Sequence, residues 1–420
     1  MKQEKGGQPG KKKNFLRHIK SLIKSMVLFG YRLLTHLVPV KKRTVVFMSS
    51  LGRSYTGNPR AICEEMAREG LLKRFRCYYI LDDPKRFSSL LPKGVHPLKN
   101  ARLRYYIVMA AAGIWVSDTR FQNYMVKRKE TIYIQTWHGT PLKKLGLDLK
   151  ELHMAGGESL LEYQEEFRKN AATWDYLISQ NPFSSKVFRQ AFDFHKTMLE
   201  IGYPRNDILV NAAQGMEISS DFCEQKLRRK LRIPEGKKVM LYAPTWRDDR
   251  FYNERDYRFA TELDFSKMRQ EFGDSYVLVV KFHYMVREKN ALCCPDFIRT
   301  VGEEIEISKL YLLADLLITD YSSAMFDYSI LGRPMYFYAY DLKNYKDVLR
   351  GFYFDFEAEA PGPIVTTTDA LIAAIKREFS QKEKERYQRF AEKYNPFDDG
   401  NASKKVVEII KRRGERRENE

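Results

Sequence analysis

The amino-acid sequence predicts an α/β fold with two domains, each built around a parallel β-sheet. The chain has 420 residues, of which 44% are hydrophobic, and this is enough for two cores because domains usually hold about 100 to 200 residues. Short apolar segments alternate with helical segments in two successive series, which is the pattern of βαβ units. A Gly/Pro turn at Ile201-Gly-Tyr-Pro-Arg-Asn-Asp207 separates the two series. We therefore expect two Rossmann-like domains with a cleft between them.

The positive charge of the chain is concentrated at its N-terminus. The formal net charge is +19, and residues 1–43 hold twelve Lys and Arg against one Glu. We therefore interpret residues 1–42 as a basic arm with an amphipathic helix. Residues 43–203 form the expected N-terminal domain, residues 204–413 the C-terminal domain, and residues 414–420 a charged tail.

The amphipathic helix of the arm is indicated by apolar residues that recur every three or four positions. This stripe consists of Phe15, Ile19, Leu22, Met26, Phe29, Leu33 and Leu37. The longest apolar run, Met26-Val-Leu-Phe29, is too short for a bilayer, which needs about 20 residues. Such a helix either packs on its own domain or lies on an anionic membrane, and the basic arm favours the membrane. No recognisable nucleic-acid-binding module accompanies the arm, so we expect no nucleic-acid partner.

The first series of strands and helices begins directly after the arm. Its predicted strands are Thr44–Met48, Cys77–Leu81, Ile114–Ser117, Ile132–Trp137 and Tyr176–Ser179. Helices fit between most of them, for example Pro59–Glu69 and Arg102–Ala112. The glycine- and hydroxyl-rich loop Leu51–Pro59 follows the first strand. It is either a contact for phosphate or sugar or a plain connection between strand and helix.

The second series starts after a helical segment that ends near Arg232. Its predicted strands are Val239–Tyr242, Tyr276–Phe282, Leu316–Thr319 and Met335–Phe337. A short amphipathic helix at Ala402–Arg413 closes the chain before the charged tail.

The cysteines and carboxylates indicate a protein without a structural metal. The five cysteines form no C-x-x-C pair and lie at no zinc-ligand spacing from a histidine, which favours a reducing, cytosolic setting. No D-x-D pair and no Walker-type glycine loop occur in the chain. A bound diphosphate would then be neutralised by Lys, Arg, His and helix N-termini rather than by a metal ion, and no cofactor is expected.

The strongest candidate for chemistry is the end of the strand Ile132–Trp137. This strand delivers His138 to a loop at the C-terminal edge of the sheet, where ligands bind in open α/β sheets. Gly139 permits close backbone approach, Thr140 offers a hydroxyl group, and Lys143 and Lys144 add positive charge. The alternative is a histidine held by local hydrogen bonds in an ordinary turn. The combination of base, donor and cation favours a functional site.

Three strand ends of the second series carry further candidates. Trp246 and Arg247 follow the strand Val239–Tyr242 and suit base stacking and phosphate binding. Lys281 and His283 lie on one face of the next strand, which suits an anionic substrate.

The strand Leu316–Thr319 is followed by the polar tetrad Asp320-Tyr-Ser-Ser323, in which Ser322 and Ser323 fit the start of a helix. Unpaired N–H groups at such a start bind phosphate, although capping of the helix alone would also explain the serines.

Five sequence blocks together resemble the CDP-glycerol glycerophosphotransferase family, which makes teichoic acids and related polymers. The blocks are Thr136-Trp-His-Gly-Thr-Pro-Leu-Lys143, Ala243-Pro-Thr-Trp-Arg-Asp248, Lys281-Phe-His283, Thr319-Asp-Tyr-Ser-Ser323 with Asp327, and Asn395-Pro-Phe-Asp-Asp-Gly400. The resemblance extends from about Arg43 to Lys411. It implies the two-domain GT-B architecture and peripheral attachment to the cytoplasmic face of the cell membrane.

The resemblance also implies a reaction and residues that carry it out. Family members move glycerol phosphate from CDP-glycerol to a lipid-linked saccharide acceptor or a growing polyol-phosphate chain and release CMP. Their two essential histidines match His138 and His283, and the helix that binds the donor phosphates matches Ser322 and Ser323. Gly139, Thr140, Lys143, Trp246, Arg247, Lys281, Asp320 and Asp327 are the further substrate-binding candidates.

Several alternatives stay open from the sequence alone. The donor could be CDP-ribitol, or the chain could be a nucleotide-sugar glycosyltransferase of the same architecture. A non-enzymatic membrane or nucleic-acid binder would explain the basic arm but none of the clusters at the strand ends. The sequence does not distinguish a primase from a polymerase, and it identifies neither the acceptor nor the oligomeric state.

Overall fold

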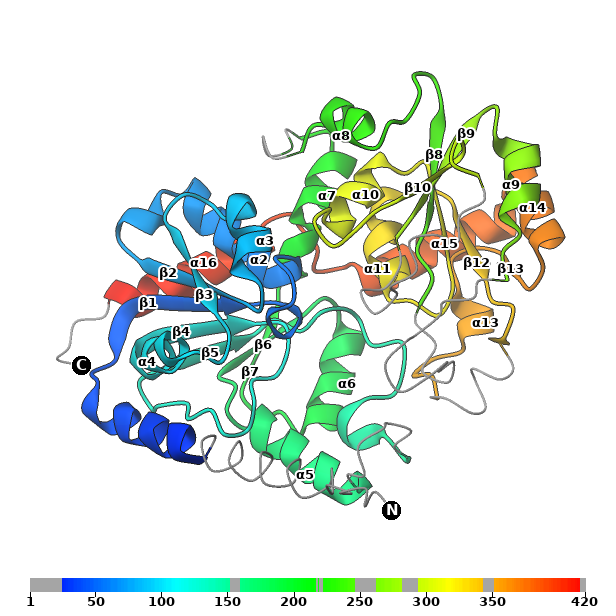
Figure 1. The fold of residues 1–420 in the computed structure, drawn as a ribbon. Helices are drawn as coiled ribbons and strands as arrows, with labels where there is room; N and C mark the ends of the chain where they lie inside the picture. The colour runs from blue at the N-terminus through cyan, green and yellow to red at the C-terminus, as the bar shows by residue number, and fades with distance from the viewer. Residues whose placement is uncertain are drawn as a thin grey trace, which may run out of the picture.

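Two parallel β-sheets, one after the other along the chain, form the framework of the protein (Figure 1). The computed structural model describes residues 25–151, 159–216, 218, 222–245, 262–281, 294–342 and 351–415. We call the seven-stranded sheet with its flanking helices the N lobe and the six-stranded sheet with its helices the C lobe. The predicted α/β architecture with two parallel sheets is confirmed.

The N-lobe sheet has the strand order β3-β2-β1-β4-β5-β6-β7. Its strands are β1 (Lys41–Met48), β2 (Arg76–Leu81), β3 (Val95–Lys99), β4 (Ala112–Ser117), β5 (Ile132–Gln135), β6 (Tyr176–Ser179) and β7 (Thr197–Glu200). The first six follow the order of a doubly wound nucleotide-binding sheet, in which the direction of winding reverses between β1 and β4. Ligands bind beyond the C-terminal ends of the strands at such a reversal.

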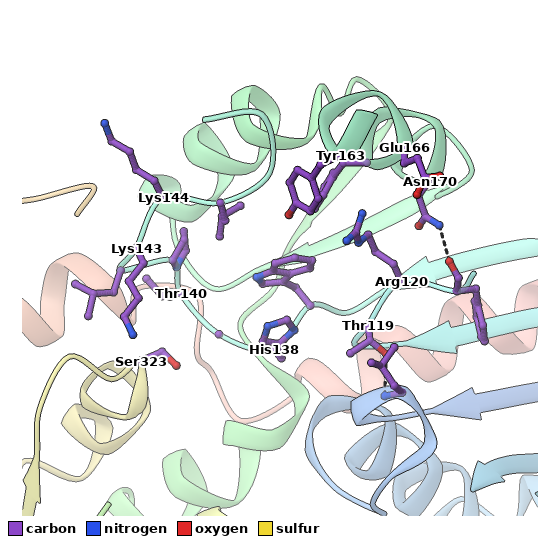
Figure 2. Close-up of a pocket in the computed structure, with 18 of the residues that line it drawn as sticks. Thr119, Arg120, His138, Thr140, Lys143, Lys144, Tyr163, Glu166, Asn170 and Ser323 are labelled. Carbon is purple, nitrogen blue, oxygen red and sulfur yellow. Dashed lines mark hydrogen bonds between the residues drawn. The ribbon is translucent and has the colours of Figure 1, made fainter. Parts of the chain in front are cut away.

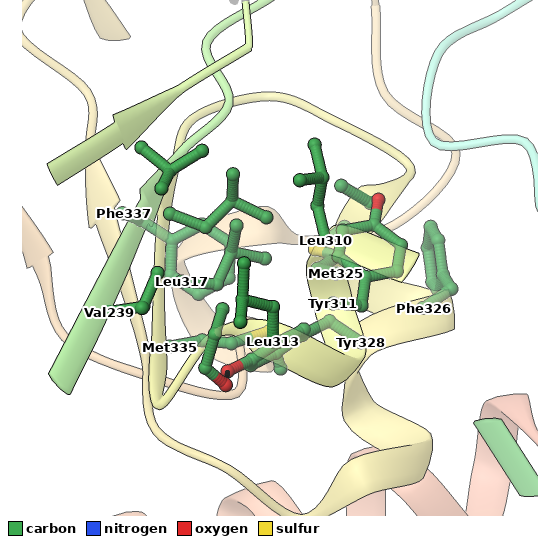
Figure 3. Close-up of a cluster of buried hydrophobic side chains, with 14 of the residues drawn as sticks. Val239, Leu310, Tyr311, Leu313, Leu317, Met325, Phe326, Tyr328, Met335 and Phe337 are labelled. Carbon is green, nitrogen blue, oxygen red and sulfur yellow. Dashed lines mark hydrogen bonds between the residues drawn. The ribbon is translucent and has the colours of Figure 1, made fainter. Parts of the chain in front are cut away.

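The C-lobe sheet repeats this arrangement with the order β10-β9-β8-β11-β12-β13. Its strands are β8 (Lys238–Tyr242), β9 (Tyr276–Val280), β10 (Ile298–Thr300), β11 (Leu316–Thr319), β12 (Met335–Tyr338) and β13 (Ile364–Val365). Val239, Leu317 and Phe337 project from three of these strands into a buried apolar cluster with residues of the adjoining helices (Figure 3).

Helices cover both sheets in the manner expected of βαβ units. In the N lobe they are α2 (Gly57–Arg68), α3 (Pro84–Phe87), α4 (Leu103–Ala111), α5 (Leu160–Ala171) and α6 (Pro182–Phe192). They continue with α7 (Asp207–Ala213), α8 (Glu224–Lys230), α9 (Phe265–Phe272), α10 (Ile307–Leu313), α11 (Ala324–Tyr328), α13 (Phe356–Glu359), α14 (Thr368–Lys376), α15 (Gln381–Tyr394) and α16 (Ala402–Glu415). Capping boxes start α5 at Ser159 and α15 at Ser380. Each serine hydroxyl accepts from the backbone N–H of the glutamate three residues later, and that glutamate side chain accepts from the backbone N–H of the serine.

The structure differs from the sequence-based prediction at several strands. Four strands were not predicted, namely β3, β7, β10 and β13. β3 carries a proline at position 97 and only two of its five residues are buried, and β13 has only two residues. The predicted strand Ile132–Trp137 ends at Gln135, because Trp137 adopts a positive φ of 51° that no strand accommodates. The end predicted at Phe282 lies outside the described residues, and β9 ends at Val280.

Residues 25–37 form a helix that packs on the N lobe through one side only. Tyr31 is buried, packs against the tilted ring of Tyr106 of α4 at a centroid distance of 5.4 Å, and donates to the carbonyl of Val126. The opposite side exposes Met26, Phe29, Leu33 and Leu37. Among the described residues, no helix is both long and apolar enough to cross a bilayer.

The last helix, α16, returns from the C lobe to the N lobe. Val406, Val407 and Ile410 are fully buried in one cluster with Val45 of β1 and Ile62 of α2. The expected boundaries assign this helix to the C-terminal domain because it follows that domain in sequence. Its apolar stripe packs beside α2 on the first sheet (Figure 1).

Substitution of Ile410 by alanine should therefore destabilise the N lobe, although Ile410 belongs to the C-terminal end of the chain. Removal of a buried Ile side chain costs about 2–5 kcal/mol of unfolding free energy. Urea denaturation, followed by the fluorescence of Trp115 and Trp174 in the N lobe, measures this loss. Lys404→Ala, at an exposed position of the same helix, serves as the control and should change stability by less than about 0.5 kcal/mol. Equal stability of Ile410→Ala and wild type would contradict this packing.

Candidate active site

A cavity of about 980 Å³ lies between the two lobes, at the C-terminal ends of strands from both sheets (Figure 2). The N lobe contributes the loops after β4 and β5 and one side of α5, whereas the C lobe contributes Thr245 after β8 and residues 321–323 after β11. This is the edge where parallel α/β sheets bind ligands. His138 lies on the cavity wall, as the sequence predicted.

The turn that delivers His138 begins with a strained residue, Trp137. A positive φ at a bulky residue costs about 1–3 kcal/mol and persists only where the surroundings enforce it. Here the Trp137 N–H donates to Gln135 Oε1 at 2.9 Å, and Asn58 Nδ2 donates to the Trp137 carbonyl at 3.0 Å. The buried indole packs against Phe188 and Phe192 of α6. These contacts hold the turn rigid directly beside His138.

The tautomer of His138 follows from its hydrogen bond. Its Nδ1 lies 2.8 Å from the backbone carbonyl oxygen of Asp118. A carbonyl oxygen can only accept, so Nδ1 carries the proton and Nε2 keeps its lone pair. The ring also stacks on Trp137 at a centroid distance of 4.5 Å. His138 is therefore oriented as a proton acceptor through Nε2.

The surroundings of His138 keep its imidazole neutral. The side chain is exposed toward the cavity. Loss of hydration next to the packed loop lowers the pKa of His138 below its ordinary value of 6.5. The Asp118 carbonyl opposes this shift, whereas the positive charge of Arg205 adds to it. A neutral imidazole is the form that a general base requires.

Gly139 brings the loop of His138 against the C lobe. Its φ of 151° and its surroundings both exclude a larger residue, because a Cβ atom here would lie 3.0 Å from Ser323 Oγ and 3.4 Å from Arg205 Nη2. The close backbone approach predicted from the sequence therefore occurs, and it places the histidine loop next to Ser323 (Figure 2).

A buried ion pair ties this loop to helix α11 of the C lobe. Arg205 donates from Nη2 to Asp327 Oδ2 at 2.6 Å and from Nη1 to the His138 carbonyl at 2.8 Å. Asn206 donates to the second oxygen of Asp327 at 3.1 Å. Burial raises the pKa of Asp327, while Arg205 and Asn206 oppose this by stabilising the carboxylate.

Glu306 of the C lobe forms a second link, at the N-terminus of α2. Its carboxylate accepts from Thr56 Oγ1 at 2.6 Å and from the Gly57 N–H at 3.3 Å. The anion-binding end of this helix is thus filled by a protein carboxylate. Of the two interpretations of the loop Leu51–Pro59, the structure favours a connection, although Leu51 itself touches the cavity.

The remaining N-lobe candidates divide into structural and cavity-facing residues. The hydroxyl of Thr140 is buried and bonded to Gln180, Asn181 and Ser184, so it holds the loop and is not available to a ligand. Lys143 and Lys144 line the cavity (Figure 2).

Ser322 and Ser323 lie on the C-lobe wall of the cavity. Ser323 occupies the N-cap position of α11 without a side-chain capping bond, and Ser322 Oγ accepts from the Ala324 N–H at 3.2 Å. Capping therefore leaves the hydroxyl group of Ser323 available to a ligand.

The carboxylates expected near the substrate are turned away from the cavity. Asp320 is buried and its Oδ1 accepts from the Thr245 N–H at 2.9 Å, which joins the loops after β8 and β11. Asp327 is engaged by Arg205 and Asn206. Both residues position the walls of the cavity, and the sequence could not reveal this because their partners lie far away along the chain.

Lys281 also points away from the cavity. Its Nζ donates to the carbonyls of Gly302 and Ile305 at 2.9 and 2.8 Å, and burial lowers its pKa. It therefore stabilises the loop before α10, and its expected contact with the diphosphate stays a prediction. The other C-lobe candidates, Trp246, Arg247 and His283, lie outside the described residues.

Within the described part of the chain, no three His, Cys, Asp or Glu residues are grouped as metal ligands would be.

Four residues that hold the histidine loop or the two lobes in place were not predicted from the sequence. They are Asn58, Asp118, Arg205 and Glu306. The sequence gives only weak signals for them, such as the Gly-Asn-Pro and Gly-Tyr-Pro-Arg turns.

Comparison with known proteins assigns a family to this site. A family model described as CDP-Glycerol:Poly(glycerophosphate) glycerophosphotransferase matches residues 31–412. The chain belongs to this family. The expectation drawn from the five sequence blocks is thereby confirmed, and the chain is a transferase.

Relatives and solved structures agree with this assignment. The transferase is 41% identical over 411 residues to the teichoic acid poly(glycerol phosphate) polymerase of Bacillus subtilis (strain 168), with 96% of this chain and 54% of that protein covered. It therefore spans about half the length of that relative. It is 37% identical over 396 residues to the teichoic acid glycerol-phosphate transferase of Staphylococcus aureus (strain NCTC 8325 / PS 47), with coverage of 93% and 98%.

The structure of the wall teichoic acid polymerase TagF is similar to that of the transferase, with a TM-score of 0.84 and 35% identity over 97% of this chain and 98% of that one. A variant of the same polymerase soaked with CDPG gives a TM-score of 0.85 at the same identity and coverage.

The tautomer and charge of His138 can be tested directly by ¹⁵N-resolved NMR of imidazole resonances. We expect Nδ1 to carry the proton and the titration midpoint to lie below pH 6.5, because desolvation disfavours the imidazolium ion. The His138→Asn variant assigns the resonance by its loss. A protonated Nε2, or a midpoint above 6.5, would contradict the geometry described here.

Proposed function

We propose that the transferase moves glycerol phosphate from CDP-glycerol to a hydroxyl group of a lipid-linked saccharide or polyol-phosphate acceptor. The acceptor oxygen attacks the phosphorus that carries glycerol, the bond from this phosphorus to the bridging diphosphate oxygen breaks, and CMP leaves. The proton of the acceptor hydroxyl passes to Nε2 of His138. The observation that carries the proposal is the orientation of His138 by the Asp118 carbonyl, in a loop whose next residue, Gly139, lies against Ser323 of the C lobe.

The two lobes would then have separate tasks. The C-lobe wall with Ser322 and Ser323 would hold the diphosphate of the donor, as the resemblance implies for the matching helix. His283, Arg247 and Trp246 belong to the same proposal on the resemblance alone. The N-lobe wall with His138, Lys143 and Lys144 would receive the acceptor. Phosphoryl transfer of this kind depends mainly on positioning and on stabilisation of charge, which these side chains supply.

We propose further that the transferase binds peripherally to the anionic cytoplasmic surface of the cell membrane. Support comes from the helix of residues 25–37, whose predicted apolar stripe is turned to solvent: Phe29 is 73% exposed and Leu37 is 69% exposed. The exposed Leu103 and Ile107 of α4 and Leu161 of α5 extend the apolar surface of the N lobe. Such a surface, next to a basic arm, suits insertion into the headgroup region.

The proposed reaction can be tested by incubation with CDP-glycerol and with CDP-ribitol, separately, on a lipid-linked disaccharide acceptor. We expect CMP release and a product heavier by one or more glycerol phosphate units, detected by mass spectrometry. Turnover of CDP-ribitol alone would assign the other polyol. Turnover of a UDP-sugar without CMP release from CDP-glycerol would identify a glycosyltransferase instead.

Replacement of His138 by alanine should remove turnover but leave CDP-glycerol binding nearly intact, because a general base acts in the transition state. The expected loss of rate is about 10²–10⁴-fold. A CMP-release assay and calorimetric titration with CDP-glycerol measure the two effects. Loss of donor binding in a folded His138→Ala protein would show that His138 contacts the donor instead.

The double variant Ser322→Ala/Ser323→Ala is the matched contrast, since it should weaken donor binding. Each lost hydrogen bond to a charged phosphate costs about 1.5–3 kcal/mol, so KM for CDP-glycerol should rise more than kcat falls. An unchanged donor KM in this variant would place the diphosphate elsewhere in the cavity.

Membrane binding should weaken when serine replaces Phe29 and Leu33, because both side chains are exposed and face away from the N lobe. Full burial of each in lipid contributes about 1.5–3 kcal/mol, which corresponds to at least about tenfold in binding per residue. Sedimentation with vesicles containing phosphatidylglycerol measures the loss. Leu90→Ser, at a partly exposed position elsewhere on the N lobe, should bind like the wild type. Equal sedimentation of all three proteins would refute the proposal.

A further inference from the structure

The cavity extends beyond His138 into a second region of the N lobe that the proposed donor and base do not occupy. Its wall comprises Arg120 after β4 and Tyr163, Glu166 and Asn170 of α5, together with Phe167 (Figure 2). None of these residues was a candidate in the sequence. Because this region adjoins His138 on the side away from the C-lobe serines, it is the place for the acceptor.

Arg120 is the cation of this region, and aromatic rings hold it. Its guanidinium carbon lies 4.1 Å from the ring centre of Phe167 and 5.5 Å from that of Tyr163. Within the described part of the chain, Arg120 forms neither an ion pair nor a hydrogen bond. A stacked guanidinium keeps the N–H groups at its edge available, and their planar arrangement matches two oxygens of a phosphate.

The backbone on both sides of Arg120 is fixed before any ligand binds. The Thr119 carbonyl accepts from Ser117 Oγ at 2.8 Å and from Tyr133 Oη and Gln135 Nε2, both at 3.2 Å. On the other side of Arg120, the carbonyl of Phe121 accepts from Asn170 Nδ2 at 2.6 Å. The side chains that orient this short loop are thus Ser117, Tyr133, Gln135 and, from α5, Asn170. A preorganised cation binds an anion with little further loss of conformational entropy.

Arg120 and His138 lie on neighbouring loops of the cavity wall (Figure 2). The two residues follow the adjacent strands β4 and β5, and His138 bonds to the carbonyl of Asp118, two residues before Arg120. An anion bound by Arg120 would therefore lie in the same cavity as the imidazole of His138.

We propose that Arg120 binds the terminal phosphodiester of an acceptor that already carries a glycerol phosphate unit, so that the free hydroxyl of this unit reaches His138. This inference rests on the proposed function and names its acceptor. Glu166 on the same wall repels an anion but accepts hydrogen bonds from hydroxyl groups, which suits the polyol and sugar next to the phosphate.

The test compares two soluble acceptors, a disaccharide glycoside that ends in one glycerol phosphate unit and the same disaccharide without it. Wild type should use the phosphorylated acceptor with the higher kcat/KM. Arg120→Gln should reduce this preference about 10- to 100-fold, as expected for loss of a hydrogen-bonded charge contact. Arg120→Lys, which keeps the charge, should retain part of the preference. Arg76→Gln, which removes an arginine stacked on Tyr78 outside the cavity, should behave like the wild type.

A third acceptor separates the two possible sources of the phosphate. It carries the disaccharide on a short prenyl diphosphate and lacks glycerol phosphate. The inference is overturned if Arg120→Gln impairs this acceptor alone, because Arg120 would then bind the lipid diphosphate. It is also overturned if folded Arg120→Gln keeps the preference of the wild type. Failure of the wild type to release CMP with any of the three acceptors would instead refute the proposed function itself.

Discussion

The buried ion pair between Arg205 and Asp327 is the contact on which the geometry of the site depends. Burial of two charges is costly unless their hydrogen-bonding groups are satisfied, and here Asn206 and the His138 carbonyl complete the arrangement. One guanidinium thus contacts the loop of His138 in the N lobe and a carboxylate of the C lobe. A rotation of the lobes that separates Arg205 from Asp327 would also move His138 relative to the C-lobe wall of the cavity, so lobe placement and the position of the base are coupled.

The strained turn at Trp137 is the local counterpart of this constraint. Its positive φ directs the chain out of β5 abruptly, and the buried indole together with Asn58 prevents relaxation. Asn58 also accepts from the Arg205 N–H at 3.1 Å, so the strained turn and the ion pair share one buried amide. The backbone carbonyls of Trp137 and His138 are therefore both held, the first by Asn58 and the second by Arg205. Such rigidity suits a base that must accept a proton at one defined point.

The sequence predicted the features that depend on local pattern. Val239–Tyr242 and Leu316–Thr319 are continuous apolar segments, and His138 stands at the end of such a segment beside Gly139. The residues that were missed act across the fold: Arg205 meets Asp327 across 122 positions, and Thr56 meets Glu306 across 250. No spacing rule links such pairs. For the same reason Asp320 and Lys281 resembled ligand-binding residues, although each also bonds to backbone groups of neighbouring loops.

The return of α16 to the N lobe also determines the order in which the protein can fold during synthesis. Arg43 donates to the carbonyl of Gly414 across 371 positions, and α16 completes the apolar cluster that β1 and α2 share. The C lobe has no such requirement, because its strands and most of its helices lie within residues 238–394. About 200 residues separate β7 from α16; at 5–20 residues per second their translation takes roughly 10 to 40 s. Throughout this interval the nascent N lobe exposes the apolar surface that α16 later covers, whereas the C lobe can complete its core before α16 is made.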